Sequence, residues 1–123
     1  MTADARILVV DDEPAVRDLV REVLTREGYR LVLAGSAEEA LAAAGGLDRI
    51  DLLLTDVSMT GMGGPDLARM LRGSHPGLVS LFMSGSLDDE PADEANGERL
   101  RFLAKPFSID GLVTAVKEAL REE

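Results

Sequence analysis

The sequence predicts an α/β fold in which a five-stranded parallel sheet carries helices on both faces. Five short apolar runs are typical of strands, and they lie near residues 6–10, 29–34, 51–56, 78–83 and 101–104. Most of the intervening segments space their apolar residues as one helical face does. Regular alternation of strand and helix favours a parallel sheet, because parallel neighbours need crossover connections. No repeat, linker or low-complexity tract interrupts the pattern, so we expect one domain over residues 1–123.

The first strand and first helix are clearly marked. Residues 6–10 are apolar and rich in β-branched side chains, which favour strands. Pro14 suits the first position of a helix, and Gly28 suits the position after its end. Over residues 14–27, five apolar side chains share one face: Val16, Leu19, Val20, Val23 and Leu24. Residues 29–34 follow as the second strand.

The middle of the chain predicts a short helix and then a central strand. Ser36 and Glu39 have the spacing of a capping box, so we expect an Ala-rich helix up to about residue 44. Residues 52–54 are three consecutive leucines, as in a strand buried on both faces. Residues 65–71 are predicted as a short helix whose apolar side chains are Leu67, Met70 and Leu71.

The last third of the chain predicts two strands, a weak helix and a strong helix. The strands are residues 78–83 and 101–104. Between them, residues 87–100 hold six acids, Pro91 and Gly97, with few apolar side chains, so we expect a short or frayed helix there. Ser108 suits the N-cap of a final helix, whose apolar face is Ile109, Leu112, Val113, Val116 and Leu120.

The composition excludes several classes of function. Lys and Arg number 13 against 23 Asp and Glu, for a net charge of −10, which disfavours direct nucleic-acid binding. No apolar run approaches the ~20 residues of a membrane span, and no signal peptide is expected before Arg6. The chain has no Cys, which fits a cytoplasmic protein. The single His75 is expected in an exposed loop, with no catalytic role.

Polar residues follow four of the predicted strands. They are Asp11 and Asp12 after the first, Asp56 after the third, Ser84 after the fourth and Lys105 after the fifth. Because parallel strands end at one edge of a sheet, these groups can converge there. Three carboxylates favour a hard cation such as Mg²⁺. A carboxylate nucleophile, Mg²⁺, a Lys and a hydroxyl together indicate phosphoryl transfer onto Asp56.

Each of these residues also has a purely structural interpretation. Asp56 could cap a turn, and an acid before Pro14 could cap a helix. Ser84 before Gly85 could form only a turn, and Lys105 could lie on the surface. Met59 and Met62 are expected to pack within the loop after Asp56. The combination at one sheet edge favours the chemical interpretation.

The same residues resemble the receiver domain of two-component response regulators. The matching motifs are Ile7-Leu8-Val9-Val10-Asp11-Asp12-Glu13-Pro14, Leu54-Thr55-Asp56-Val57-Ser58-Met59 with Gly61-Met62 and Gly64, Met83-Ser84-Gly85, and Lys105-Pro106-Phe107. Four motifs in this order make the resemblance strong. It implies a flavodoxin-like (βα)5 doubly wound fold with strand order 2-1-3-4-5.

The resemblance also implies a role for each site residue. Asp56 would accept phosphate from a phosphohistidine of a histidine kinase or a histidine phosphotransfer protein. Asp12, Asp56 and the backbone carbonyl of Ser58 would ligate Mg²⁺, with Asp11 acting mainly through bound water. Ser84 and Lys105 would contact the phosphoryl group. Phe102 would be the switch aromatic, although an aromatic in a short strand is also ordinary core.

Thr60 and the run over residues 81–85 bear on the kind of receiver that this sequence resembles. Thr60 stands where the family usually has Pro, which could loosen the loop beside Asp56 but removes no reactive group. The run over residues 81–85 is similar to receivers attached to hybrid sensor histidine kinases. Such a domain signals by conformational change rather than as an enzyme, in some cases through a phosphorylation-dependent dimer. No output domain follows Glu123, so we expect the output to act through a partner or through further chain.

Two other functions remain open at the level of sequence. One is a small Mg²⁺-dependent phosphatase with an aspartyl-phosphate intermediate. Such enzymes usually place a second acid two residues after the nucleophile, where this chain has Ser58. The other is a receiver-like interaction module that takes no phosphate, and the presence of all five acceptor-site residues argues against it.

Overall fold

Five parallel strands form one sheet in the computed structural model, which describes residues 5–85 and 101–121. The strands are β1 (Arg6–Val10), β2 (Arg30–Ala34), β3 (Leu52–Asp56), β4 (Val79–Ser84) and β5 (Arg101–Ala104). Their order is β2-β1-β3-β4-β5, and every neighbouring pair is parallel. The predicted parallel sheet and its 2-1-3-4-5 order are therefore confirmed.

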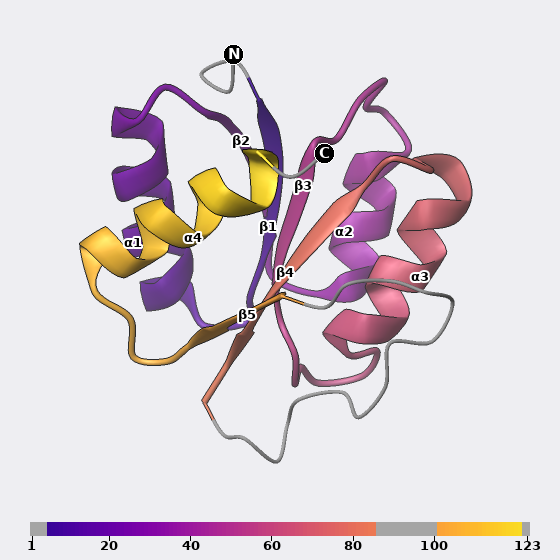
Figure 1. The fold of residues 1–123 in the computed structure, drawn as a ribbon. Coiled ribbons are helices and arrows are strands. Elements are labelled where there is room, and N and C mark those ends of the chain that lie inside the picture. Colours follow the sequence, from indigo (N-terminus) through magenta and orange to yellow (C-terminus); the bar gives the residue numbers. More distant parts are fainter. Residues whose placement is uncertain (1–4, 86–100, 122–123) are drawn as a thin grey trace.

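The helices lie in two layers, one on each face of the sheet (Figure 1). Helices α1 (Pro14–Arg26) and α4 (Ile109–Arg121) cover one face, and α2 (Ala37–Ala44) and α3 (Gly64–Ser74) cover the other. Successive residues of a strand point to opposite faces. Accordingly Ile7 and Val9 pack under α1 and α4, whereas Leu8 and Val10 pack under α2 and α3. This doubly wound arrangement is the one expected of a flavodoxin-like fold.

Local signals set the ends of the first two helices. Gly28 has φ of 95°, and the hydrogen bonds from Gly28 N to Thr25 O (3.0 Å) and from Tyr29 N to Leu24 O (3.3 Å) close α1. At the start of α2, Ser36 Oγ accepts the backbone N–H of Glu39 at 3.1 Å. The Glu39 carboxylate returns to the N–H of Gly35, one residue before the usual capping-box partner. The predicted stop and start are both confirmed.

Three apolar side chains that the helical pattern placed on buried faces are exposed. Leu19, Met70 and Ile109 are 40%, 53% and 57% exposed, so the covered stripe on α1, α3 and α4 is narrower than predicted. Helix α3 is also longer than the predicted residues 65–71, because its polar last turn continues to Ser74.

The prediction for His75 is only partly confirmed. His75 follows α3 in a loop, but it is half-buried rather than exposed, with its Nε2 atom 3.4 Å from Leu47 O.

Two further predictions concern the helix expected over residues 87–100 and the absence of a membrane span. The short or frayed helix expected over residues 87–100 lies outside the described residues. Among residues 5–85 and 101–121, every helix is too short or too polar to cross a membrane.

Candidate functional site

The carboxyl ends of four strands bring polar side chains to one edge of the sheet. Asp11 directly follows β1, Asp56 is the last residue of β3, and Lys105 directly follows β5. Ser84 ends β4 and pairs with Ala104 in the sheet. The backbone N–H of Lys105 donates to Ser84 O at 2.8 Å, which fixes the end of β5 against β4. The strand ends therefore converge as the sequence predicts.

Lys105 is the cation at the centre of this edge. Its Nζ lies 2.9 Å from Asp11 Oδ2, 3.3 Å from Asp56 Oδ2 and 3.6 Å from a carboxylate oxygen of Glu13. Only 17% of the Lys105 side chain is exposed. Burial lowers the pKa of Lys105, but the hydrogen bond and charge of Asp11, with the charge of Asp56, outweigh it and leave that pKa raised. Lys105 is thus a stable ammonium group at neutral pH.

Asp11 is fully buried and held at every polar atom of its side chain and backbone. Oδ1 accepts the N–H of Glu13 at 2.9 Å, while Oδ2 takes the hydrogen bond from Lys105. Its own N–H donates to Ala34 O at 3.2 Å, and its carbonyl accepts Nη1 of Arg17 at 2.7 Å. The structural interpretation of an acid before Pro14 as only a helix cap does not explain this burial, or the bond from the carboxylate to Lys105.

Asp56 is the carboxylate best placed to react. Its side chain is 14% exposed, so it is reachable but poorly solvated. Burial raises the pKa of Asp56, and the nearby Asp11 carboxylate adds to this, while Lys105 and a backbone hydrogen bond from Ser58 oppose it; the net pKa is raised. A desolvated carboxylate is a stronger nucleophile than one in bulk water.

The three aspartates of this edge form a group that fits a hard cation. Asp11, Asp12 and Asp56 each offer a carboxylate oxygen, and these oxygens lie within 4.8 Å of one another. Oxygen ligands at such spacing suit Mg²⁺ or Ca²⁺ rather than a thiolate- or imidazole-binding metal. Asp12 is exposed, so an ion could reach the group from solvent. Lys105 alone does not balance the charge of these carboxylates, which leaves the group with a net negative charge.

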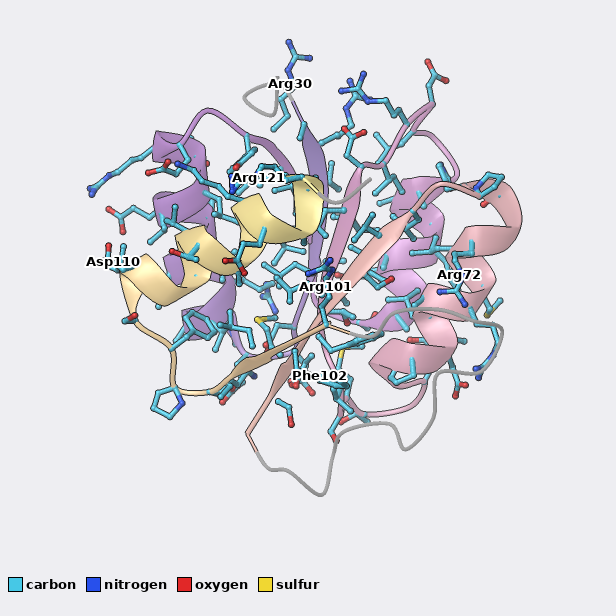
Figure 2. All side chains as sticks on the ribbon, in the orientation of Figure 1. Arg30, Arg72, Arg101, Phe102, Asp110 and Arg121 are labelled. Atoms are coloured by element: carbon cyan, nitrogen blue, oxygen red, sulfur yellow. The ribbon has the colours of Figure 1, made fainter. Side chains whose placement is uncertain are left out.

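The remaining predicted site residues lie around this group. Ser84 is 6% exposed, and Ser58 and Thr60 are exposed in the loop after β3. Phe102 lies on β5, as Figure 2 shows, and its ring centre is 5.8 Å from that of Phe82. Met59 and Met62 pack partly against the core under α2 and α3, which confirms their expected role in loop packing.

Two residues that shape this edge were assigned no role from the sequence. Arg17 reaches back from α1 to the Asp11 carbonyl. Gly64 begins α3 so close to β3 that a Cβ atom there would lie 2.3 Å from Asp56 O. The helical pattern marks Arg17 only as polar, and a glycine between Gly63 and Pro65 marks only a turn. Long-range contacts of this kind leave no local signal.

One groove in the described surface lies away from this edge. An open groove of about 590 Å³ lies beside the start of β3 and the end of α3, and Ala5, Ile50, His75 and Leu120 are among its lining residues. None of the three clustered aspartates lines it. Because the titratable groups with altered pKa lie at the carboxyl edge, we place the functional site there.

Comparison with protein families gives one match over most of the chain. The model described as "Response regulator receiver domain" matches residues 7–117. Among curated proteins, the sensor kinase CckA of Brucella abortus is 39% identical over 129 residues, which cover all of this chain and 13% of that protein. The probable transcriptional regulatory protein TcrX of Mycobacterium tuberculosis is 36% identical over 118 residues, covering 94% of this chain and 49% of TcrX. The chain thus spans half or less of these relatives.

Solved structures give the same fold. The receiver domain from the hybrid histidine kinase CckA has a TM-score of 0.80 at 37% identity, covering 95% of this chain and 100% of that one. The chemotaxis response regulator CheY4 of Vibrio cholerae has a TM-score of 0.84 at 27% identity, covering 95% and 99%.

Proposed function

This chain belongs to the response regulator receiver domain family, and from that premise we propose that Asp56 accepts a phosphoryl group from a phosphohistidine. The observation that carries the proposal is the position of Asp56: a poorly solvated carboxylate 3.3 Å from Lys105, in one group with Asp11 and Asp12. The product of this reaction is an aspartyl phosphate. Receiver domains are signalling modules, so the purpose of the reaction is a change of conformation rather than release of a metabolite.

The residues of the site suit an in-line transfer. A carboxylate oxygen of Asp56 attacks phosphorus, the O–P bond forms, and the P–N bond to the donor imidazole breaks. The Lys105 ammonium, already beside both Asp11 and Asp56, offers its charge to the incoming phosphoryl oxygens. The Ser84 hydroxyl, at the end of the neighbouring strand, offers a hydrogen bond to the same group.

The aspartates also account for the expected cofactor. Asp11, Asp12 and Asp56, with the backbone carbonyl of Ser58, would hold Mg²⁺. The ion, when bound, supplies positive charge next to the transferred phosphoryl group. Asp11 keeps its hydrogen bond to Lys105 in this scheme, which suits a role through bound water rather than direct ligation.

The signal is proposed to pass from Ser84 to Phe102. Ser84 and Ala104 are partners in the β4–β5 ladder, and Phe102 lies two residues before Ala104. Phe102 is half-buried against Phe82, so a shift of Ser84 toward a phosphoryl group would alter how this edge strand packs. Phe102 is therefore our candidate for the switch aromatic.

The partners follow from the chemistry and the charge. The donor is a histidine kinase or a histidine phosphotransfer protein, and residues 1–123 act as one receiver domain in the cytoplasm. A net charge of −10 disfavours direct contact with nucleic acid. The relatives include a sensor kinase and a transcriptional regulator, so either architecture could supply the rest of the signalling path. A dimer that forms on phosphorylation is compatible with both.

Intact-mass measurement tests the proposal. We expect the protein to gain one phosphoryl group on incubation with Mg²⁺ and acetyl phosphate, whereas Asp56→Asn gains none. Asp18→Asn, a change of an exposed acid on α1, is the matched control and should label like the wild type. Labelling of Asp56→Asn would refute the assignment. No labelling of the wild type, even by a panel of sensor kinases, would support an interaction module, and turnover of a phosphomonoester would support a phosphatase.

A further inference from the structure

The backbone of Asp11 is held on both sides, its N–H by the end of β2 and its carbonyl by α1. On one side its N–H donates to Ala34 O at 3.2 Å. On the other side its carbonyl accepts a 2.7 Å hydrogen bond from Nη1 of Arg17, a half-buried residue. The carboxylate of the same residue is bound to Lys105. Rotation of the Asp11–Asp12 peptide, whose carbonyl Arg17 holds, would therefore disturb a buried site carboxylate and the start of the acidic turn, residues 11–13.

The Arg17 guanidinium lies close against Gly35, where an added Cβ would make a tight contact. A Cβ atom on Gly35 would lie 3.1 Å from Arg17 Nη1 and 3.6 Å from Cζ. The backbone at Gly35 cannot easily retreat, because its N–H donates to the Glu39 carboxylate at 2.6 Å within the capping box of α2. Arg17 thus links the fixed start of α2 to the Asp11 carbonyl.

We propose that Arg17 is a positioning residue for the acidic turn, and that Gly35 maintains its guanidinium in place. The inference rests on the proposed function, because it assigns Arg17 a role in setting the affinity of the aspartate group for Mg²⁺. Arg17 acts through the Asp11 backbone and touches no carboxylate of the group by any described hydrogen bond or ion pair. Loss of a hydrogen bond that orients a metal ligand without touching the ion typically weakens metal affinity by about 10- to 100-fold.

Charge and position make opposite predictions for Arg17. Loss of a positive charge near three acids would by itself strengthen Mg²⁺ binding. Loss of a positioning hydrogen bond would weaken it. Gly35→Ala separates the two effects, because it should push the guanidinium aside by a few tenths of an ångström without removing its charge.

The first measurement is the Mg²⁺ dissociation constant of the unphosphorylated protein, by titration calorimetry. We expect Arg17→Met and Gly35→Ala each to weaken binding, by about tenfold for Arg17→Met. Arg21→Met, one turn along α1 at an exposed Arg, and Gly77→Ala, where a Cβ would meet no described atom within 4 Å, should both bind as the wild type does. Tighter or unchanged Mg²⁺ binding by Arg17→Met would overturn the proposal, since it would show that the hydrogen bond to the Asp11 carbonyl does not position the aspartate group.

The double variant decides whether the two residues act together. If Gly35 works through Arg17, adding Gly35→Ala to Arg17→Met should cause no further loss of Mg²⁺ affinity; additive losses would refute that link. At saturating Mg²⁺ the labelling rate of both single variants should return to the wild-type rate. If Arg17→Met does not fold, Gly35→Ala alone must show the weaker binding. Failure of the wild type to label would instead contradict the proposed function, so the two failures are distinguishable.

Discussion

Lys105 Nζ donates a 2.9 Å hydrogen bond to Oδ2 of Asp11, a residue 94 positions earlier in the chain. The bond joins the ends of β1 and β5. These two strands lie on opposite sides of β3 in the sheet, since the order is β2-β1-β3-β4-β5. Lys105 also reaches Asp56 at 3.3 Å. One ammonium group therefore ties together the first, third and fifth strands at the edge where we place the chemistry.

The raised pKa of Asp56 predicts a pH dependence of stability in the metal-free protein. Its folded-state pKa lies above the ordinary 3.8, chiefly because of burial, so between these two values the native state binds more protons than the unfolded state. The contribution of Asp56 to the free energy of unfolding should therefore fall as pH rises through that window. Asp56→Asn carries no such proton, so its stability relative to the wild type should rise over the same window and then level off. Urea denaturation at several pH values would measure this; a constant difference from pH 3 to 7 would contradict it.

Mg²⁺ should raise the melting temperature at neutral pH. Repulsion within the aspartate group destabilises the metal-free fold, and an ion that binds only the native state stabilises it by mass action. At ten times its dissociation constant the expected gain is about 1.4 kcal/mol, or a rise of about 5 °C. Asp12→Ala should lose this response while melting no lower than the wild type without metal, because Asp12 is exposed. Equal shifts in both proteins, measured by calorimetry, would argue against the cation site.

Gly64→Ala should destabilise the fold and disturb Asp56. A Cβ at this position would lie 2.3 Å from Asp56 O and 3.1 Å from a methyl carbon of Thr55, so the backbone must shift. We expect a loss of about 2–3 kcal/mol in urea denaturation, together with slower phosphorylation. Gly73→Ala is the matched control in the same helix, since its Cβ would meet no described neighbour within 4 Å; it should be neutral or stabilising by up to about 1 kcal/mol. Equal stability of the two variants would show that α3 starts elsewhere in solution.

Ser80→Ala should stabilise the protein. Ser80 Oγ is buried on β4 and has no hydrogen-bond partner among the described residues. Removal of an unsatisfied buried hydroxyl should gain about 1 kcal/mol in thermal or urea denaturation. Ser36→Ala, which removes the N-cap of α2, should have the opposite sign and lose about 1 kcal/mol. A clear loss of stability in Ser80→Ala would indicate a partner for the hydroxyl.

Local patterns were sufficient to predict the sheet and the meeting of its strand ends. The leucine run of β3 indicates a central strand and the β-branched run of β1 indicates a further strand. Their parallel alignment brings Asp11 and Asp56 to the same edge. The contact between Lys105 and Asp11 follows from that geometry, although they are far apart in the chain.

The features that sequence reasoning missed depend on how elements approach one another. Leu19 fits the apolar period of α1 but is 40% exposed, because the period does not reveal how much of the helix its neighbours cover. Arg17, in the first turn of α1, and Gly35 meet only because the start of α1 lies beside the end of β2. The half-burial of His75 likewise arises from its approach to Leu47, which no local pattern encodes.

The contact of Lys105 with Asp11 also has a consequence for synthesis on the ribosome. The chain emerges from its amino end, so both aspartates leave the exit tunnel well before residue 105 is translated. Until β5 docks, the acids at the ends of β1 and β3 lack the ammonium that joins them. The last strand, held to β4 by the Lys105 N–H and Ser84 O, delivers that countercharge on docking. A complete acceptor site therefore first exists when β5 has left the ribosome and docked beside β4.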